Sequence, residues 1–264
     1  MYPPSATSAG SPMRVFALSD IHVDYDENAR WLEALSKYDY RDDVLILAGD
    51  VSDSIELLTW TLGLLARRFR HVSFVPGNHD LWVIRDRPRQ TSLKKFETVQ
   101  QRARDSGAAT EVLRCGALSI VPLLAWYDYS FGPPDRDLAR TWMDYRACAW
   151  PSDYGAAEVT AHFLACNEPS LLDAAGTVIS FSHFLPRIDV MPKRAEGARW
   201  FYPVLGTDRL ERQIRRLGST IHAYGHSHVN RHVTIDGVRY VNNAFGYPHE
   251  RRISRKSLVC IHEL

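Results

Sequence analysis

The chain has 264 residues, of which 45% are hydrophobic, and its 32 Lys and Arg side chains stand against 31 Asp and Glu side chains. This content is sufficient to bury the core of one large domain. The formal net charge of +1 excludes a global electrostatic attraction to nucleic acid or to an anionic membrane. The four cysteines are scattered without a CxxC spacing, which favours reduced thiols and a cytoplasmic protein.

The composition of the first twelve residues differs from that of the rest. Residues 1–12 are rich in Pro, Ser, Ala, Thr and Gly and are predicted to form a disordered tail, which leaves residues 13–264 as a single domain. No run of residues approaches the roughly 18 consecutive apolar side chains that a membrane helix needs. We therefore expect a protein without membrane contact.

Strand and helix patterns alternate from residue 13 onward. Short apolar runs predict buried strands at 15–18, 44–48, 72–75, 118–124, 177–181 and 221–224. Apolar residues at helical spacing predict helices at 27–37, 54–68, 94–105, 156–172 and 207–217. Near the C-terminus, residues 231–235, 237–242 and 257–262 alternate like antiparallel strands around an Asp236-Gly237 turn. This order predicts a layered α/β domain.

Residues 126–155 interrupt that pattern. Eight aromatic side chains stand there among prolines and charges without a clear period: Trp126, Tyr127, Tyr129, Phe131, Trp142, Tyr145, Trp150 and Tyr154. We interpret the segment as a cap or insertion, in which Tyr127 and Tyr145 are candidates for stacking on a substrate ring. The alternative is that these rings pack into the body of the domain.

Five short motifs follow the predicted strands. They are Asp20-Ile21-His22, Gly49-Asp50-Val51-Ser52-Asp53, Gly77-Asn78-His79-Asp80, Ser182-His183 and Gly225-His226-Ser227-His228. Ligands and substrates of α/β sheets bind where strand ends meet loops, so these side chains are expected to gather at one place. Oxygen and imidazole donors without cysteine suit divalent ions such as Mn, Fe, Zn, Ni or Mg. The motifs therefore predict a metal site.

The motif series resembles that of the calcineurin-like metallophosphoesterases, whose pattern is DxH, GDxxD, GNH(D/E), a lone His and GHxH. The resemblance covers nearly all of residues 13–242. It implies an α/β fold that is a four-layer α-β-β-α sandwich with two mixed sheets, and a site for two divalent metal ions. By the same resemblance, one metal would be held by Asp20, His22, Asp50 and His228. The second would be held by Asp50, Asn78, His183 and His226.

The resemblance also implies how the site works. A carboxylate shared by both ions, here Asp50, holds them about 3.5–4 Å apart, so that a bridging hydroxide can attack phosphorus. His79 is implied to approach the phosphoryl oxygen or the leaving group as a proton donor, with Asp80 orienting its ring. Asp53 is either a supporting acid or a helix cap.

Arginines close to two of the motifs are candidates for contact with substrate. Arg85 lies soon after the third motif, and Arg187 and Arg194 follow His183; guanidinium groups suit phosphate oxygens. A further basic cluster at 251–256 could meet nucleic acid, but a solvated turn is the favoured interpretation.

These observations predict a phosphoesterase that hydrolyses a phosphate monoester or diester of a small metabolite or nucleotide. A nuclease or a cyclic-nucleotide phosphodiesterase is the alternative among enzymes, although the neutral charge makes a nucleic-acid partner unlikely. The alternative from another class is a non-catalytic, metal-binding interaction scaffold. The sequence leaves open the oligomeric state, the native metals and the choice between monoester and diester.

Overall fold

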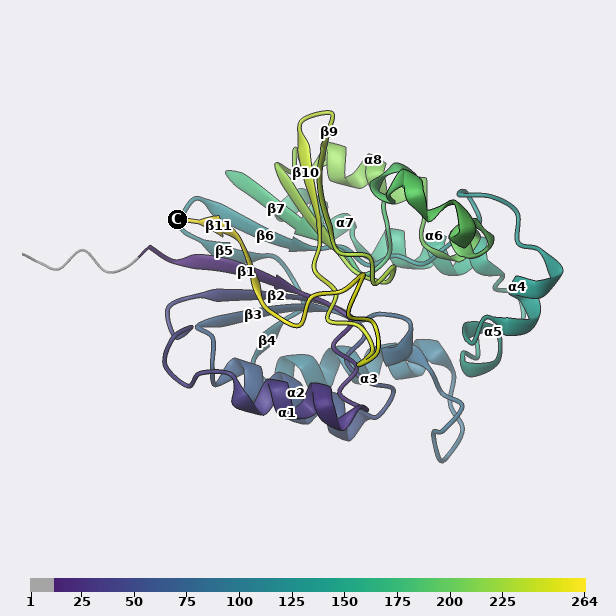
Figure 1. Cartoon of the computed structure of the whole chain (residues 1–264), viewed down its shortest axis with the longest axis horizontal. Helices are drawn as coiled ribbons and strands as arrows, with labels where there is room; N and C mark the ends of the chain where they lie inside the picture. Colours follow the sequence, from purple (N-terminus) through teal and green to yellow (C-terminus); the bar gives the residue numbers. More distant parts are fainter. Residues whose placement is uncertain (1–11) are drawn as a thin grey trace, which may run out of the picture.

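Two β-sheets lie face to face in the computed structural model, which describes residues 12–264 apart from the side chains of 194–198 (Figure 1). The first sheet has the strand order β11-β1-β2-β3-β4 and the second has the order β5-β6-β7-β8-β10-β9. The strands are β1 (Arg14–Leu18), β2 (Val44–Ala48), β3 (His71–Val75), β4 (Ala108–Ala109), β5 (Leu113–Cys115), β6 (Leu118–Pro122), β7 (Thr177–Phe181), β8 (Ile221–Tyr224), β9 (Arg231–Ile235), β10 (Val238–Asn242) and β11 (Val259–Glu263). Residues 1–11 of the predicted tail lie outside the described residues.

Helices cover the outer faces of both sheets. Helices α1 (Asp26–Ala34), α2 (Ile55–Ala66) and α3 (Ser92–Asp105) lie below the first sheet in Figure 1, and α6 (Ala156–Cys166), α7 (Glu168–Asp173) and α8 (Asp208–Arg216) lie on the second. Shorter helical segments are η1 (His79–Leu81), α4 (Arg136–Thr141), α5 (Asp144–Ala147), η2 (Ile188–Val190) and η3 (Lys193–Val204). The expected four-layer sandwich of two mixed sheets is confirmed.

Alternating side chains of each strand build two different cores. On β1, Val15 and Ala17 face the other sheet, whereas Phe16 and Leu18 pack with the helices α1 and α2. This division follows from the two-residue period of a strand. Both faces of the strand are buried, which explains why the sequence shows a continuous apolar run instead of alternation.

The parallel strands bring their carboxyl ends to one edge of the sandwich. Strands β1, β2 and β3 run parallel in the first sheet, and β6, β7, β8 and β10 run parallel in the second. A bridge between Ser19 and Ala244 joins the two groups just beyond the strand ends. The motif loops of both sheets therefore meet at this edge.

Two elements differ from their predictions. The single helix expected at 156–172 is split into α6 and α7 at Asn167, whose side chain bonds to the backbone N–H and C=O of Leu124 at 2.8 Å each. The antiparallel tail is divided between the sheets. Strands β9 and β10 form the expected hairpin, but β11 crosses to the first sheet and pairs with β1.

Much of the aromatic segment 126–155 belongs to the packed body. Trp126 and Tyr127 are 1% and 2% exposed and join a cluster that includes Phe163 and Phe184. The middle of the segment, with α4 and α5, projects beside the strand ends at the right of Figure 1. Among the described helices, none has the length and apolar character needed to cross a membrane.

Candidate metal centre

Backbone hydrogen bonds fix the motif loops to one another across the two sheets. The N–H of Asp20 donates to the carbonyl of Gly49 at 2.9 Å, and the N–H of Gly225 donates to the carbonyl of His183 at 2.9 Å. The N–H of His226 donates to the Asp20 carboxylate at 3.0 Å, linking β8 to β1. The loops that follow β1, β2, β7 and β8 therefore form one connected scaffold.

Seven predicted ligands converge into two groups that share Asp50. One group contains Asp20, His22, Asp50 and His228, and the other contains Asp50, His183 and His226, with ligand atoms within 4.8 Å of one another in each. The Oδ1 atom of Asn78 lies 3.0 Å from Nε2 of His183, which adds the amide to the second group. The structure thus brings together every residue that the resemblance assigned to metal.

The spacing of these donors fits cation coordination. The Nε2 atoms of His22 and His228 are 3.2 Å apart, and His183 Nε2 is 3.1 Å from His226 Nδ1. Donors at about 2.0–2.2 Å from a metal ion are separated by roughly 3.0–3.5 Å along an edge of its coordination polyhedron. These separations therefore match neighbouring ligands of one ion in each group.

Three of the histidines are oriented by a partner on the ring nitrogen that faces away from the centre. His183 Nδ1 lies 2.9 Å from the carbonyl of Ala48, and His226 Nε2 lies 3.0 Å from the carbonyl of Val204. His228 Nδ1 lies 2.6 Å from the Glu250 carboxylate. Because each acceptor requires an N–H, the opposite nitrogen is the lone-pair donor that faces the cluster.

The electrostatics of the centre also favour a cation. Burial, with the nearby carboxylates of Asp20 and Asp80, raises the pKa of Asp50 well above its usual range. Burial opposes protonation of His228, yet Asp20 and Glu250 raise its pKa to about 10. Buried carboxylates need a compensating positive charge, which a divalent ion would supply.

The backbone is strained at the same place. Seven non-glycine residues of the described chain have positive φ, and five of them are predicted ligands: Asp20 (53°), His22 (41°), Asp50 (57°), His226 (67°) and His228 (54°). Such conformations cost about 1–3 kcal/mol each and concentrate at functional sites. Gly77 has a steric role, because a Cβ there would overlap Oδ1 of Asp50.

His79 and Asp80 are arranged differently from the expectation. The Asp80 carboxylate accepts four backbone N–H groups, from Gly77, Asp50, Val51 and Ser52, at 2.8–3.0 Å. It thus organises two ligand loops instead of orienting the His79 ring.

The His79 ring stacks instead on Trp82, with a centroid distance of 3.7 Å and an interplanar angle of 28°. Burial lowers the pKa of His79 to about 3. The expected role as a proton donor included a ring oriented by Asp80, and this contact is absent from the described hydrogen bonds of Asp80. The geometry therefore favours a neutral imidazole that donates one N–H.

A cavity of about 200 Å³ opens directly over the ligands. Its lining includes Asp50, Asn78, His79, Trp142, Trp200, Phe201, His226, His228, Tyr247 and Glu250. Trp142 approaches His226 edge to face, with centroids 5.8 Å apart. The aromatic segment therefore does reach the metal centre, through Trp142.

The sequence model of the calcineurin-like phosphoesterase family matches residues 13–230 of the chain. The chain belongs to this family. The predicted activity is thereby confirmed at the level of a phosphoric ester hydrolase.

This calcineurin-like phosphoesterase is similar to a phosphodiesterase over most of its length. The acyl-carrier-protein phosphodiesterase PptH of Mycobacterium tuberculosis is 29% identical over 273 residues, which cover 93% of this chain and 81% of the relative. The crystal structure of the phosphopantetheinyl hydrolase PptH from the same organism matches with a TM-score of 0.77 at 26% identity, covering 96% of this chain and 97% of that chain. The likeness extends beyond the motifs to the whole fold.

Two of the predicted substrate-binding arginines in this phosphoesterase have acidic partners. Arg85 pairs with Asp53, with Nε 2.6 Å from Oδ2. Arg187 bonds to three carboxylates at 2.6–3.3 Å, those of Asp189, Glu211 and Asp236. Asp236 lies at the hairpin turn that precedes β10, at the end of the sheet opposite the ligands. The Arg187 guanidinium therefore bonds to these carboxylates at a distance from the predicted metal ligands.

The remaining three substrate candidates are placed as follows. The side chain of Arg194 lies outside the described residues. Tyr127 is 2% exposed and packs with the core, so the stacking role predicted for it is wrong. Tyr145 is 37% exposed and its hydroxyl lies 3.1 Å from that of Tyr129, which leaves it accessible beside the site.

Three residues at the centre have roles that the sequence did not indicate. Glu250 orients His228, and Tyr247 packs against the His22 ring with centroids 4.6 Å apart. Asp144 bonds to the side-chain amide of Asn78 at 2.9 Å. None of the three stands in a motif, and only their contacts reveal them.

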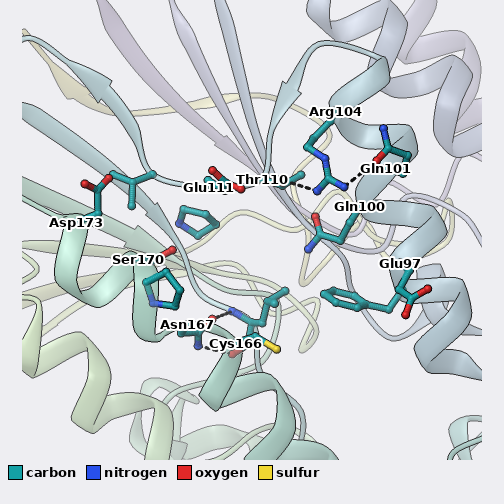
Figure 2. Close-up of a pocket in the computed structure, with 15 residues that line it drawn as sticks. Glu97, Gln100, Gln101, Arg104, Thr110, Glu111, Cys166, Asn167, Ser170 and Asp173 are labelled. Carbon is teal, nitrogen blue, oxygen red and sulfur yellow. Dashed lines mark hydrogen bonds between the residues drawn. The ribbon is translucent and has the colours of Figure 1, made fainter.

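A larger cavity of about 610 Å³ lies elsewhere on this phosphoesterase, between α3 and the α6–α7 junction (Figure 2). The guanidinium of Arg104 in its wall bonds to Gln101 and Thr110, and Asn167 bonds within the wall as well (Figure 2). None of the predicted metal ligands lines it. We therefore place the reaction at the smaller cavity.

Proposed function

We propose that the chain is a two-metal phosphodiesterase that hydrolyses the diester between a phosphopantetheinyl group and a carrier protein. The main support for two-metal hydrolysis is the pair of candidate ligand groups that share Asp50. The likeness to PptH across nearly the whole of both chains supports the substrate class. This proposal replaces the expected free metabolite or nucleotide by a protein-borne phosphodiester.

The small size of the cavity supports a substrate of this kind. Its volume of about 200 Å³ is smaller than the roughly 300–1,000 Å³ typical of pockets for small ligands, so it suits a phosphoryl group with part of a thin chain. The ligands His226 and His228 are each 8% exposed, and the His79 side chain is 19% exposed. A phosphorus atom close to a protein surface can therefore reach the centre.

Exposed apolar side chains surround the mouth of the cavity. Trp200 lines it and is 48% exposed, and Tyr25, which packs against the cavity residue Tyr247, is 43% exposed. Met143 and Tyr145 lie next to Trp142 and Asp144 in the sequence and are 38% and 37% exposed. Exposed apolar surface beside a catalytic centre favours contact with a macromolecule.

The donor set suits borderline transition ions. Four imidazoles, two carboxylates and an amide face the centre, and imidazole ligands favour Zn, Fe or Ni, with Mn accommodated by the oxygen donors. Two such cations, when bound, would polarise the phosphoryl group and lower the pKa of a coordinated water molecule.

The residues of the chain then orient the substrate. Asp50 fixes the separation of the two sites, and the Asp80 carboxylate holds the loops that carry Asp50 and Asn78. The neutral His79 ring, fixed by its stacking on Trp82, is in place to donate a hydrogen bond to a phosphoryl oxygen. Trp142, against the His226 ring, and Tyr247, against the His22 ring, line the cavity with aromatic surface.

The test is hydrolysis of a phosphopantetheinylated carrier protein by metal-reconstituted enzyme. Intact-protein mass spectrometry should record conversion of the carrier to its unmodified form, and Asp50→Asn should abolish that conversion. Bis-p-nitrophenyl phosphate and a nucleoside monophosphate serve as comparison substrates. Rapid turnover of the monophosphate with an unchanged carrier protein would overturn the proposed substrate while leaving the metal chemistry standing.

A further inference from the structure

Asp144 is a buried carboxylate that joins the aromatic segment to the metal centre. It begins α5 and is 2% exposed. Its Oδ1 accepts the side-chain N–H of Asn78 at 2.9 Å and of Trp82 at 2.7 Å, and its Oδ2 accepts the indole N–H of Trp142 at 2.8 Å. Three donors thus converge on one side chain: two flank η1, and the third belongs to the aromatic segment itself.

Each of the three donors belongs to a different part of the site. Because the amide nitrogen of Asn78 faces Asp144, its oxygen faces His183 Nε2, at 3.0 Å, where a metal ligand is needed. Trp82 is the residue on which the His79 ring stacks. Trp142 forms a wall of the cavity and meets the edge of the His226 ring.

We propose that Asp144 is a positioning residue for hydrolysis at this centre. It selects the rotamer of the Asn78 amide that offers oxygen to metal, it fixes the Trp82 platform under His79, and it anchors Trp142 over the cavity. The proposal rests on phosphoester hydrolysis at this site and not on the carrier-protein substrate, so a small aryl diester can test it.

The two carboxylate oxygens of Asp144 separate these contacts. An Asn at this position can keep its oxygen on the side of Asn78 and Trp82, which retains two hydrogen bonds, and then turns its NH₂ toward the indole N–H of Trp142. Asp144→Asn therefore loses the Trp142 contact alone, as does Trp142→Phe. Asp144→Ala loses all three contacts.

The experiment compares these three variants by metal titration and by kcat and KM on bis-p-nitrophenyl phosphate. Asp144→Asn and Trp142→Phe should keep both metals and kcat while KM rises roughly fivefold, the effect of losing one ordinary hydrogen bond. Asp144→Ala should in addition bind the second metal about 10–100-fold more weakly, as is usual when an outer partner of a ligand is removed.

Asn167→Ala is the matched control for loss of buried hydrogen bonds. Asn167 is also 2% exposed and makes three side-chain hydrogen bonds of 2.8 Å, to Leu124 and Gln213, away from the metals. It should lower the melting temperature and leave metal affinity and kcat unchanged.

Two results would overturn the proposal. The first is an Asp144→Ala enzyme that resembles Asn167→Ala, with a lower melting temperature but unaltered metal affinity and kcat. The second is a Trp142→Phe enzyme that binds metal as weakly as is expected of Asp144→Ala. Trp142→Phe keeps the Asp144–Asn78 hydrogen bond, so its metal loss could not come from a misoriented Asn78 amide. If Asp144→Ala does not fold, Asp144→Asn becomes the test. An Asp144→Asn enzyme that loses metal but keeps the wild-type KM contradicts the roles assigned to the two carboxylate oxygens.

Discussion

Removing the Glu250 carboxylate should weaken one of the two metal sites selectively. Glu250 accepts the Nδ1–H of His228 at 2.6 Å and the backbone N–H of Tyr247 at 2.8 Å. It touches none of the ligands of the second group. Glu250→Ala is therefore expected to release the orientation of His228 while the Asn78, His183 and His226 site stays intact.

The expected magnitude follows from those contacts. Loss of a partner behind a ligating histidine costs about 10–100-fold in metal affinity, which is about 1.4–2.7 kcal/mol at 1.4 kcal/mol per factor of ten. Glu250→Gln keeps an acceptor oxygen and loses only the charge. Because a neutral hydrogen bond has roughly half the strength of a charged one, the loss should be about 3–10-fold.

Metal titration against a competing chelator measures both affinities, and Glu27→Gln provides the control. That change also removes one negative charge, but Glu27 pairs with Arg251 at 3.3 Å on the surface, with side chains 50% and 74% exposed, where ion pairs contribute little. Its metal affinities should equal those of the wild type. Wild-type affinities in Glu250→Ala would refute the role assigned to Glu250.

Three further outcomes are expected. His79→Asn should keep both metals and lower kcat about 10²–10³-fold, as for loss of one hydrogen-bond donor to a phosphoryl oxygen. Equal losses of kcat on aryl and alkyl esters support a neutral donor. A larger loss on alkyl esters indicates that His79 acts as a general acid. Gly77→Ala should lose metal and melt at a lower temperature, because its Cβ overlaps Asp50. The control Gly63→Ala lies in the interior of α2, where a Cβ has space, and should stabilise the protein by up to about 1 kcal/mol. Equal melting temperatures of the two variants would contradict the overlap at Gly77. Arg187→Ala should reduce stability through its lost carboxylate contacts and leave KM unchanged, so a raised KM at constant stability argues for substrate contact.

Local sequence accounts for the ligands of the centre. Asp20, Asp50 and His183 each follow directly on a buried strand, and parallel strands deliver their ends to one edge. The predicted strands agree with the observed ones because a strand buried on both faces leaves a continuous apolar run in the sequence. His222 of β8, a histidine outside the five motifs, lies 2.8 Å from the Ser180 hydroxyl and 3.0 Å from the Ser182 hydroxyl, so it is satisfied within the core.

Contacts between distant segments account for what the sequence did not reveal. Asp144 lies 66 residues from Asn78, and Glu250 lies 22 residues from His228, so no local pattern joins them. Asp80 was expected beside the His79 ring because the family resemblance implied that it orients this ring. The short helix η1 turns its carboxylate toward four backbone N–H groups instead.

The shared carboxylate of Asp50 is the central claim, and the metal content of Asp50→Asn tests it most directly. Elemental analysis of the wild-type protein after reconstitution should give two equivalents of metal per chain. Asp50→Asn should lose affinity at both sites, whereas His22→Ala, which affects only the first group, should retain one equivalent. Two full equivalents bound to Asp50→Asn would contradict the account.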